Sequence, residues 1–166
     1  KQTKKINPEC TVEVLTPDFK GYEPALKIVF DAKPDIFSHN VECVERISKA
    51  VRAQANWQRS LGVLEKSIQH GLRTKTGIMV GLGEEVEEVK KTMRQVVDLG
   101  VQIFTIGQYL QPTKNHLKVE EYISKEQFEL YKEYGYSIGF KVVESGPLVR
   151  SSYHADEQAR MVFNNG

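Results

Sequence analysis

The sequence predicts an α/β fold in which parallel strands alternate with helices, and three observations lead to this prediction. Short β-forming runs alternate along the chain with longer amphipathic segments. The central run, Ile78-Met79-Val80, is apolar throughout, which is typical of a strand covered on both faces. Gly81 and Gly83 follow it directly and lead into an amphipathic helix pattern, as expected of a strand-to-helix connection in a parallel fold.

The first elements follow this alternation. Residues 11–16 are rich in β-formers and end at Pro-Asp, which predicts a strand and then a loop. A helix is predicted from Pro24, which suits a first helical turn, to the break at Pro34. Residues 35–38 form the next predicted strand. The helix predicted after it has its apolar positions at Val44, Ile47 and Val51.

The later elements repeat the pattern. Asn56 is a predicted helix cap, and Gly71 closes that helix. Behind the central strand, Glu84 and Glu85 open a helix that ends at Gly100, and the two glutamates are placed in its first turn. The remaining predictions are a strand over 101–107, a helix behind the capping-box signature Ser124-Lys125-Glu126-Gln127, and a candidate fifth strand over 139–143.

Four strands in this order fit half of a βα barrel or an open doubly wound sheet. The length of 166 residues suffices for one domain with a core. With 23 basic and 22 acidic side chains, the net charge of +1 gives no electrostatic reason to expect nucleic acid or an anionic membrane as a partner. No apolar run approaches the ~20 residues that span a bilayer, and no signal peptide is visible.

Cys10 and Cys43 are far apart and lack a CxxC-type spacing, so they do not by themselves complete a zinc or iron–sulfur site. A disulfide is an alternative, but we expect two buried free thiols because nothing else indicates an oxidising compartment. The chain begins with Lys1 rather than Met, which suggests a piece of a longer protein.

Polar residues follow the carboxyl ends of successive predicted strands, and a βα barrel builds its active site on that rim. The glycine turn is interpreted as a hydrogen-bonding ledge for a neutral planar group, because Glu84 and Glu85 would repel a phosphate. Each residue also has a purely structural explanation, such as a core histidine or glutamines that satisfy loop carbonyls. The residues concerned are Asp18, His39, Asn40, Glu42, Gly81, Gly83, Glu84, Gln108 and Gln111.

Several ordered motifs resemble the lipoyl synthase family of radical S-adenosylmethionine enzymes. The resemblance extends from Val12 to Asp156 and implies a partial (β/α)6 TIM-type barrel that holds strands 3–6 and a C-terminal extension. The motifs are Glu13-Val14-Leu15-Thr16-Pro17-Asp18-Phe19, His39-Asn40-Val41-Glu42, residues 74–84, residues 105–112 and residues 145–156.

The resemblance implies a site for S-adenosylmethionine. Gly77, Met79, Gly81 and Glu84 resemble the superfamily pattern Gly-x-Ile-x-Gly-x-x-Glu, with Met79 in the isoleucine position, and this segment would support the adenine. Further roles are implied for residues beside the ribose and methionine part (Asn40, Glu42), near the adenine (Gln108 to Leu110) and at the cofactor's carboxylate (Arg59).

Ser152, within Arg150-Ser151-Ser152-Tyr153, resembles the seryl ligand of the family's auxiliary 4Fe–4S cluster. A serine oxygen is harder than a thiolate and suits a cluster that is dismantled as the sulfur source. Arg150 would favour negative charge beside it. The full-length family members carry two 4Fe–4S clusters on two cysteine triads, and both triads are absent here. We therefore expect a carboxyl-terminal portion that is inactive alone.

The implied reaction inserts two sulfur atoms into an octanoyl chain held on a lysine of a carrier protein, after a deoxyadenosyl radical abstracts hydrogen. The expected partners are the octanoylated lipoyl-carrier protein or domain and an electron donor protein, in the cytoplasm or, in a eukaryote, the mitochondrion. Residues 1–10 are expected to be a flexible end, 11–139 the partial barrel and 140–166 the extension. Two alternatives stay open, namely another radical sulfur inserter such as a biotin-synthase-like barrel, and a non-catalytic module that binds a nucleoside or a carrier protein.

Overall fold

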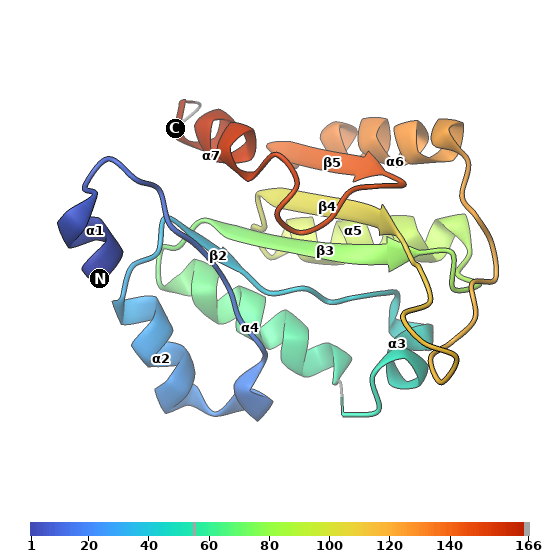
Figure 1. Ribbon diagram of the computed structural model, residues 1–166, viewed down its shortest axis with the longest axis horizontal. Coiled ribbons are helices and arrows are strands. Elements are labelled where there is room, and N and C mark those ends of the chain that lie inside the picture. The colour runs from blue at the N-terminus through green and yellow to red at the C-terminus, as the bar shows by residue number, and fades with distance from the viewer. Residues whose placement is uncertain (55, 165–166) are drawn as a thin grey trace.

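The computed structural model describes residues 1–54 and 56–164, and its centre is a parallel five-stranded sheet (Figure 1). The strands lie in sequence order, β1-β2-β3-β4-β5, as in a βα barrel and not as in a doubly wound sheet. The predicted α/β class is confirmed, and the candidate fifth strand is present. The strands are β1 (Glu13–Leu15), β2 (Ile36–Ser38), β3 (Thr74–Val80), β4 (Ile103–Gln108) and β5 (Val142–Gly146).

Helices pack mainly on one face of this sheet, and in Figure 1 α4, α5 and α6 lie behind the strands. Their apolar stripes meet the alternate strand residues Ile78, Val80, Phe104 and Ile106 in the largest hydrophobic cluster. The helical elements are α1 (Gln2–Ile6), the 3-10 turn η1 (Phe19–Gly21), α2 (Glu23–Asp31), α3 (Glu45–Val51), α4 (Trp57–Gln69), α5 (Val86–Asp98), α6 (Lys125–Ser137) and α7 (Ala155–Asn164).

The helix starts show which sequence signals were accurate. Asn56 caps α4 by accepting from the Arg59 N–H at 2.9 Å, and Ser124 caps α6 by accepting from the Gln127 N–H at 3.1 Å, so both predicted caps are confirmed. The predicted start of α5 is two residues too early. Glu85 is its N-cap and forms a capping box with Glu88, while Glu84 lies before the helix.

The opposite face of the sheet is covered by α7, a helix that the sequence analysis did not predict. Ala159 and Val162 of α7 pack on Ile36, Ile103 and Val142. These three share one face because Ile103 pairs in register with Val142 and Lys75, Lys75 pairs with Ser38, and Ile36 is two residues before Ser38. Acidic residues at 156 and 157 followed by this apolar spacing were the available signal.

A buried ion pair lies on the same face, near the amino ends of the strands, where Lys75 pairs in register with Ile103. The Nζ atom of Lys75 on β3 is 3.0 Å from Oε1 of Glu13 on β1, with β2 between the two strands. The Lys75 side chain is fully buried, whereas that of Glu13 is 20% exposed. This pair therefore ties β1 to the centre of the sheet.

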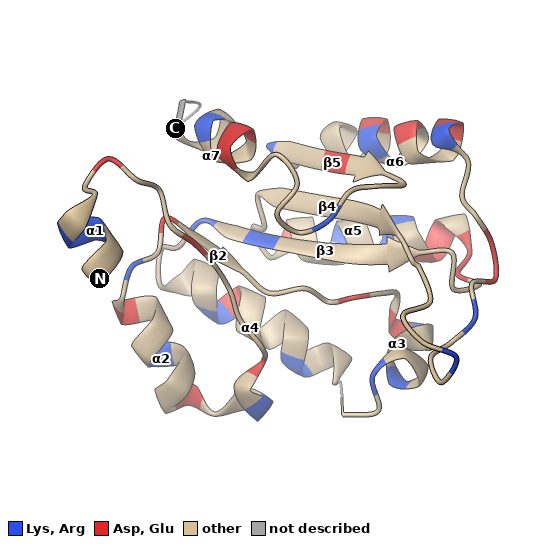
Figure 2. Cartoon of the chain, viewed as in Figure 1, with Lys and Arg blue, Asp and Glu red and all other residues tan. Residues whose placement is uncertain are grey.

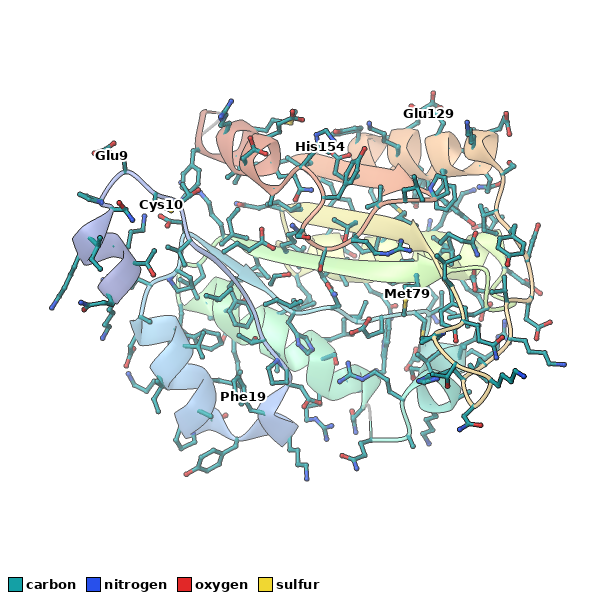
Figure 3. The ribbon with its side chains drawn as sticks, in the orientation of Figure 1. Glu9, Cys10, Phe19, Met79, Glu129 and His154 are labelled. Atoms are coloured by element: carbon teal, nitrogen blue, oxygen red, sulfur yellow. The ribbon has the colours of Figure 1, made fainter. Side chains whose placement is uncertain are left out.

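The N-terminal segment lies apart from the core. Helix α1 has no buried residue, and Cys10, labelled in Figure 3, is exposed. The prediction of a buried thiol is thus wrong for Cys10, because no layer packs over the segment that carries it. It is confirmed for Cys43, where burial raises the thiol pKa to about 12. Both cysteines are free.

Charged residues of both signs are interspersed over the helices and loops in Figure 2, in agreement with the near-zero net charge. Within residues 1–54 and 56–164, no helix is long and apolar enough to cross a membrane.

Candidate functional site

A bulge after β2 sets the position of the first predicted site residues. Ser38 pairs with Lys75, and the next pairing joins Glu42 to Ile78. The chain after β2 therefore advances by four residues while β3 advances by three, and the extra residue forms the bulge. The Thr76 hydroxyl holds the bulge by donating to the His39 carbonyl at 2.7 Å and accepting from the Val41 N–H at 3.3 Å. Glu42 has φ 73°, a strained conformation for a residue with a side chain.

A cavity of about 130 Å³ opens at the carboxyl ends of the strands, close to Met79 in Figure 3. It brings together residues that follow or end β2, β3 and β4 with the segment that follows β5, so four separate parts of the chain converge as the rim hypothesis expects. The lining residues are Asn40, Glu42, Gly77, Ile78, Met79, Thr105, Gly107, Val149, Arg150 and Ser151.

Other predicted residues lie outside this lining and build the loops around it. The Glu84 carboxylate accepts from the N–H groups of Gly81 at 2.5 Å and Leu82 at 2.9 Å. These two N–H groups are therefore already used within the chain, which argues against the Gly81 turn as a hydrogen-bonding ledge. Gly81 has φ 98°, a backbone conformation that favours glycine.

Gln108 holds the loop between β4 and α6. Its Nε2 donates to the carbonyls of Tyr109 and Glu121, each at 3.0 Å, and its Oε1 accepts from the Ile123 N–H at 2.9 Å. Gln111 likewise donates to the His116 carbonyl at 2.9 Å. Both glutamines therefore donate to loop carbonyls, as the purely structural explanation expects. Leu110, between them, is 49% exposed.

Arg59 lies on α4 and faces the loop after β1. Its Nε donates to the Asp18 carboxylate at 2.6 Å, and its Nη2 donates to the Gln54 carbonyl at 2.9 Å. His39 is buried nearby, and its Nδ1 is 3.0 Å from the Thr16 carbonyl oxygen. Burial lowers the pKa of His39, so the imidazole is neutral near pH 7.

Unsatisfied polar atoms gather at the ends of β1 and β2. Within the described residues, the buried atoms Thr16 Oγ1, Ser38 Oγ, His39 Nε2 and Asn40 Oδ1 have no hydrogen-bond partner. Buried polar groups are usually paired, so a group of four in one region indicates that a further molecule or segment completes it.

Glu42 has a pKa raised by burial, an effect that Arg52, 3.3 Å from its carboxylate, partly offsets. A raised pKa in the folded state contributes stability below the ordinary pKa, and this contribution is lost as the pH rises through the folded-state value. We expect Glu42→Gln to increase the free energy of unfolding at neutral pH and to have little effect in acid.

Urea unfolding of the full-length protein at a series of pH values measures this effect, with the exposed Glu65→Gln as the control. If the free energy of unfolding depends on pH in the same way for the wild type and for Glu42→Gln, this prediction is wrong.

The described residues do not provide the set of ligands that an iron–sulfur cluster requires. Among the residues that the structure describes, no group of three or more His, Cys, Asp or Glu side chains gathers. Cys43 is buried with a raised pKa, and Cys10 is exposed. Ser152 is exposed and directly follows Ser151 of the cavity lining, so it offers one oxygen and no companion ligand.

For a nucleoside the fit is better but incomplete. Asn40 and Glu42 offer polar groups, and Gly77 and Gly107 line the cavity although Thr105 Oγ1 and the Val149 carbonyl already lie close over them. A volume of about 130 Å³ is smaller than the ~300 Å³ at which ligand pockets begin, so the cavity holds part of such a ligand. Sequence reasoning missed Thr105, Gly107 and Val149 as lining residues, because only the sheet register and the return of the chain after β5 place them there.

A parallel βα sheet in sequence order, with a cavity at the carboxyl ends of its strands, is the arrangement of the βα-barrel class of proteins, which place their active sites at that end. The model of the Radical SAM superfamily matches residues 1–96, more than half of the chain, and the chain belongs to this superfamily. Membership implies S-adenosylmethionine and iron–sulfur chemistry.

The relatives are more specific. The chain is 57% identical over 153 residues to a lipoyl synthase of Rubrobacter xylanophilus. This alignment covers 91% of this chain and 48% of that protein. It is 52% identical over 159 residues to a lipoyl synthase of Phocaeicola vulgatus, with coverage of 96% and 56%. The chain thus spans about half the length of the curated relatives it matches. An HpcH/HpaI aldolase from Desulfitobacterium hafniense aligns with a TM-score of 0.41 at 12% identity, over 84% of this chain and 55% of that one, which is too low to carry an argument.

Proposed function

We propose that this chain is the carboxyl-terminal portion of a lipoyl synthase, which inserts two sulfur atoms into a protein-bound octanoyl group. The observation that carries the proposal is the identity of 50–57% to lipoyl synthases over 91% or more of this chain. It is supported by the cavity, which joins the strand-end residues Asn40 and Glu42 to Ser151, the neighbour of the proposed cluster ligand.

In this proposal the cavity holds one side of S-adenosylmethionine, which supplies the radical for hydrogen abstraction. Asn40 and Glu42 bind the ribose and methionine part, and Gly77 and Met79 lie under the adenine. Five further residues contribute from around this cavity. Gly81, Glu84 and Gln108 shape the adenine-side loops together with Leu110, and Arg59, whose charge is shared with Asp18, pairs with the cofactor's carboxylate.

Ser152 is the proposed oxygen ligand of the auxiliary 4Fe–4S cluster. We propose that the cysteine ligands of both clusters lie in a part of the longer protein that this chain does not span. The chain is therefore proposed to work only within the longer protein, with residues 11–139 as partial barrel and 140–166 as extension. The proposed partners are an octanoylated lipoyl-carrier protein or domain and an electron donor protein, in the cytoplasm or the mitochondrion.

The test is an anaerobic assay of the full-length protein with reconstituted clusters, an octanoylated carrier, S-adenosylmethionine and a reductant. The expected product is a carrier on which two C–H bonds have become C–S bonds, as measured by intact-protein mass. Cleavage of S-adenosylmethionine without sulfur on the carrier would favour another radical enzyme. Binding of S-adenosylmethionine or the carrier without any cleavage would favour the non-catalytic module.

A further inference from the structure

The bulge after β2 is fastened to β3 at both of its ends. At the first end the His39 N–H donates to the Lys75 carbonyl at 3.1 Å, and at the second the Glu42 N–H donates to the Gly77 carbonyl at 3.2 Å. Between these two bonds the regular ladder is interrupted by the extra residue. The orientation of the side chains in this stretch therefore depends on what holds the backbone between the two ends.

Thr76 holds the middle of the bulge. Its hydroxyl donates to the His39 carbonyl at 2.7 Å and accepts from the Val41 N–H at 3.3 Å. One of these groups belongs to the residue before Asn40 and the other to the residue after it, so a single hydroxyl fixes the backbone on both sides of Asn40. Thr76 is fully buried, and without the hydroxyl both backbone groups would lose a partner inside the protein.

Asn40 has an acceptor atom that the described part of the chain leaves unused. Asn40 lines the cavity at the carboxyl ends of the strands, and its Oδ1 is buried without a hydrogen-bond partner among the described residues. A buried acceptor without a donor is costly, so such an atom in a cavity wall indicates a donor on the molecule that fills the cavity. The hydroxyl groups of a sugar are donors of this kind.

We propose that Thr76 is a positioning residue for Asn40, since its hydroxyl fixes the backbone on both sides of Asn40 and so the direction in which the amide meets a bound nucleoside. This inference rests on the proposed function, in which Asn40 binds the ribose and methionine part of S-adenosylmethionine. Thr76 is not one of the residues that line the cavity, so it acts on the ligand through the bulge.

Thr74 provides a matched control. It lies two residues before Thr76 on β3, so the two side chains are on the same face of the strand, and both are fully buried. The Thr74 hydroxyl also has two partners, because it lies 2.7 Å from Ser67 Oγ and donates to the Leu72 carbonyl at 3.2 Å. Valine in place of either threonine removes one buried hydroxyl at nearly constant volume, but only Thr76→Val removes the bonds around Asn40.

The experiment compares Thr76→Val, Thr76→Ser and Thr74→Val in the full-length protein, with S-adenosylhomocysteine as the probe in isothermal titration calorimetry. We expect Thr76→Val to weaken binding of the probe by roughly tenfold or more, because a misdirected buried amide leaves a hydrogen bond to the ligand unmade. Thr76→Ser keeps the hydroxyl and should bind the probe as the wild type does, and so should Thr74→Val. Equal affinities in the two valine variants would overturn the inference.

Amide hydrogen exchange of the same variants gives a readout that needs no ligand. The Val41 N–H should exchange faster in Thr76→Val, because its acceptor is gone, and should keep its protection in Thr76→Ser and Thr74→Val. Unchanged protection of Val41 in Thr76→Val would show that the hydroxyl does not hold the bulge, and the inference would be wrong.

Asn40→Ala separates this inference from the proposed function. If Asn40→Ala weakens binding of the probe and Thr76→Val does not, the nucleoside site stands and the positioning role of Thr76 is wrong. If neither substitution weakens binding, Asn40 does not contact the ligand, and both the inference and that part of the proposed function are wrong. Should Thr76→Val fail to fold, Thr76→Cys takes its place, because a thiol is only a weak donor and acceptor. Wild-type affinity in Thr76→Cys would then contradict the inference.

Discussion

Replacing Glu13 with alanine is expected to lower the free energy of unfolding by about 3–5 kcal/mol, because it leaves a buried charge without its partner. The Lys75 ammonium is 3.0 and 3.2 Å from the two carboxylate oxygens of Glu13, and the Lys75 side chain is fully buried. With the carboxylate gone, the ammonium keeps the cost of its burial without the charge that offsets it. Urea unfolding of the full-length protein measures the loss.

Two controls identify the cause of that loss. Asp31→Ala breaks the exposed ion pair with Lys27, whose side chains are 66% and 52% accessible, and should change stability little. The double substitution Glu13→Leu with Lys75→Met removes both charges together and should recover most of the loss, because well-packed apolar pairs replace buried ion pairs at little cost. If Glu13→Ala destabilises no more than Asp31→Ala, the buried pair does not hold β1 to the sheet.

Ser152→Ala is expected to reduce sulfur insertion by at least about 100-fold, since loss of even an indirect partner of a metal ligand commonly costs 10–100-fold. The neighbouring Ser151→Ala is a closely matched control, because it removes the same hydroxyl one position away, from a residue that lines the cavity. Product formation and iron content of the full-length protein are the measurements. Similar losses in the two variants would show that the segment, and not the Ser152 oxygen, is what matters.

Ser152→Cys extends this test. A thiolate is a softer ligand than an alkoxide, so the cluster is expected to assemble and to release its iron and sulfur more slowly. The prediction is therefore a retained cluster spectrum with reduced transfer of sulfur. A variant that matches wild type in both measurements would contradict the idea that a hard oxygen ligand labilises this iron.

Local signals in the sequence were enough for most of the secondary structure. Asn56 and Ser124 cap helices because a side-chain oxygen needs only the N–H three residues further on. The apolar run Ile78-Met79-Val80 identified the central strand for a similarly local reason. The unpredicted α7 is different, since the role of its apolar side becomes evident only from its contacts with Ile36, Ile103 and Val142 on three strands.

The candidate site divides in the same way. From the sequence by itself, Asn40 and Glu42 were predicted to follow a strand end, because alternation of strands and helices brings those ends to one rim. The family resemblance added Gly77 and Met79, which lie within β3 and also line the cavity. The sequence did not separate residues that face the cavity from those that build its surroundings. Gln108 and Glu84 have suitable polar groups, yet their hydrogen bonds are used on the loops at 81–82 and 121–123.

Only the tertiary structure decided that Gly107 lies beneath the Val149 carbonyl and that Lys75 is neutralised by a residue 62 positions away. These facts depend on strand register and on the return of the chain after β5, which are set by the packing of the whole sheet. A sequence window records composition and spacing, and both contacts join residues that no single window contains. For this reason the family and the rim were predictable from the sequence, while the close packing of Val149 on Gly107 was not.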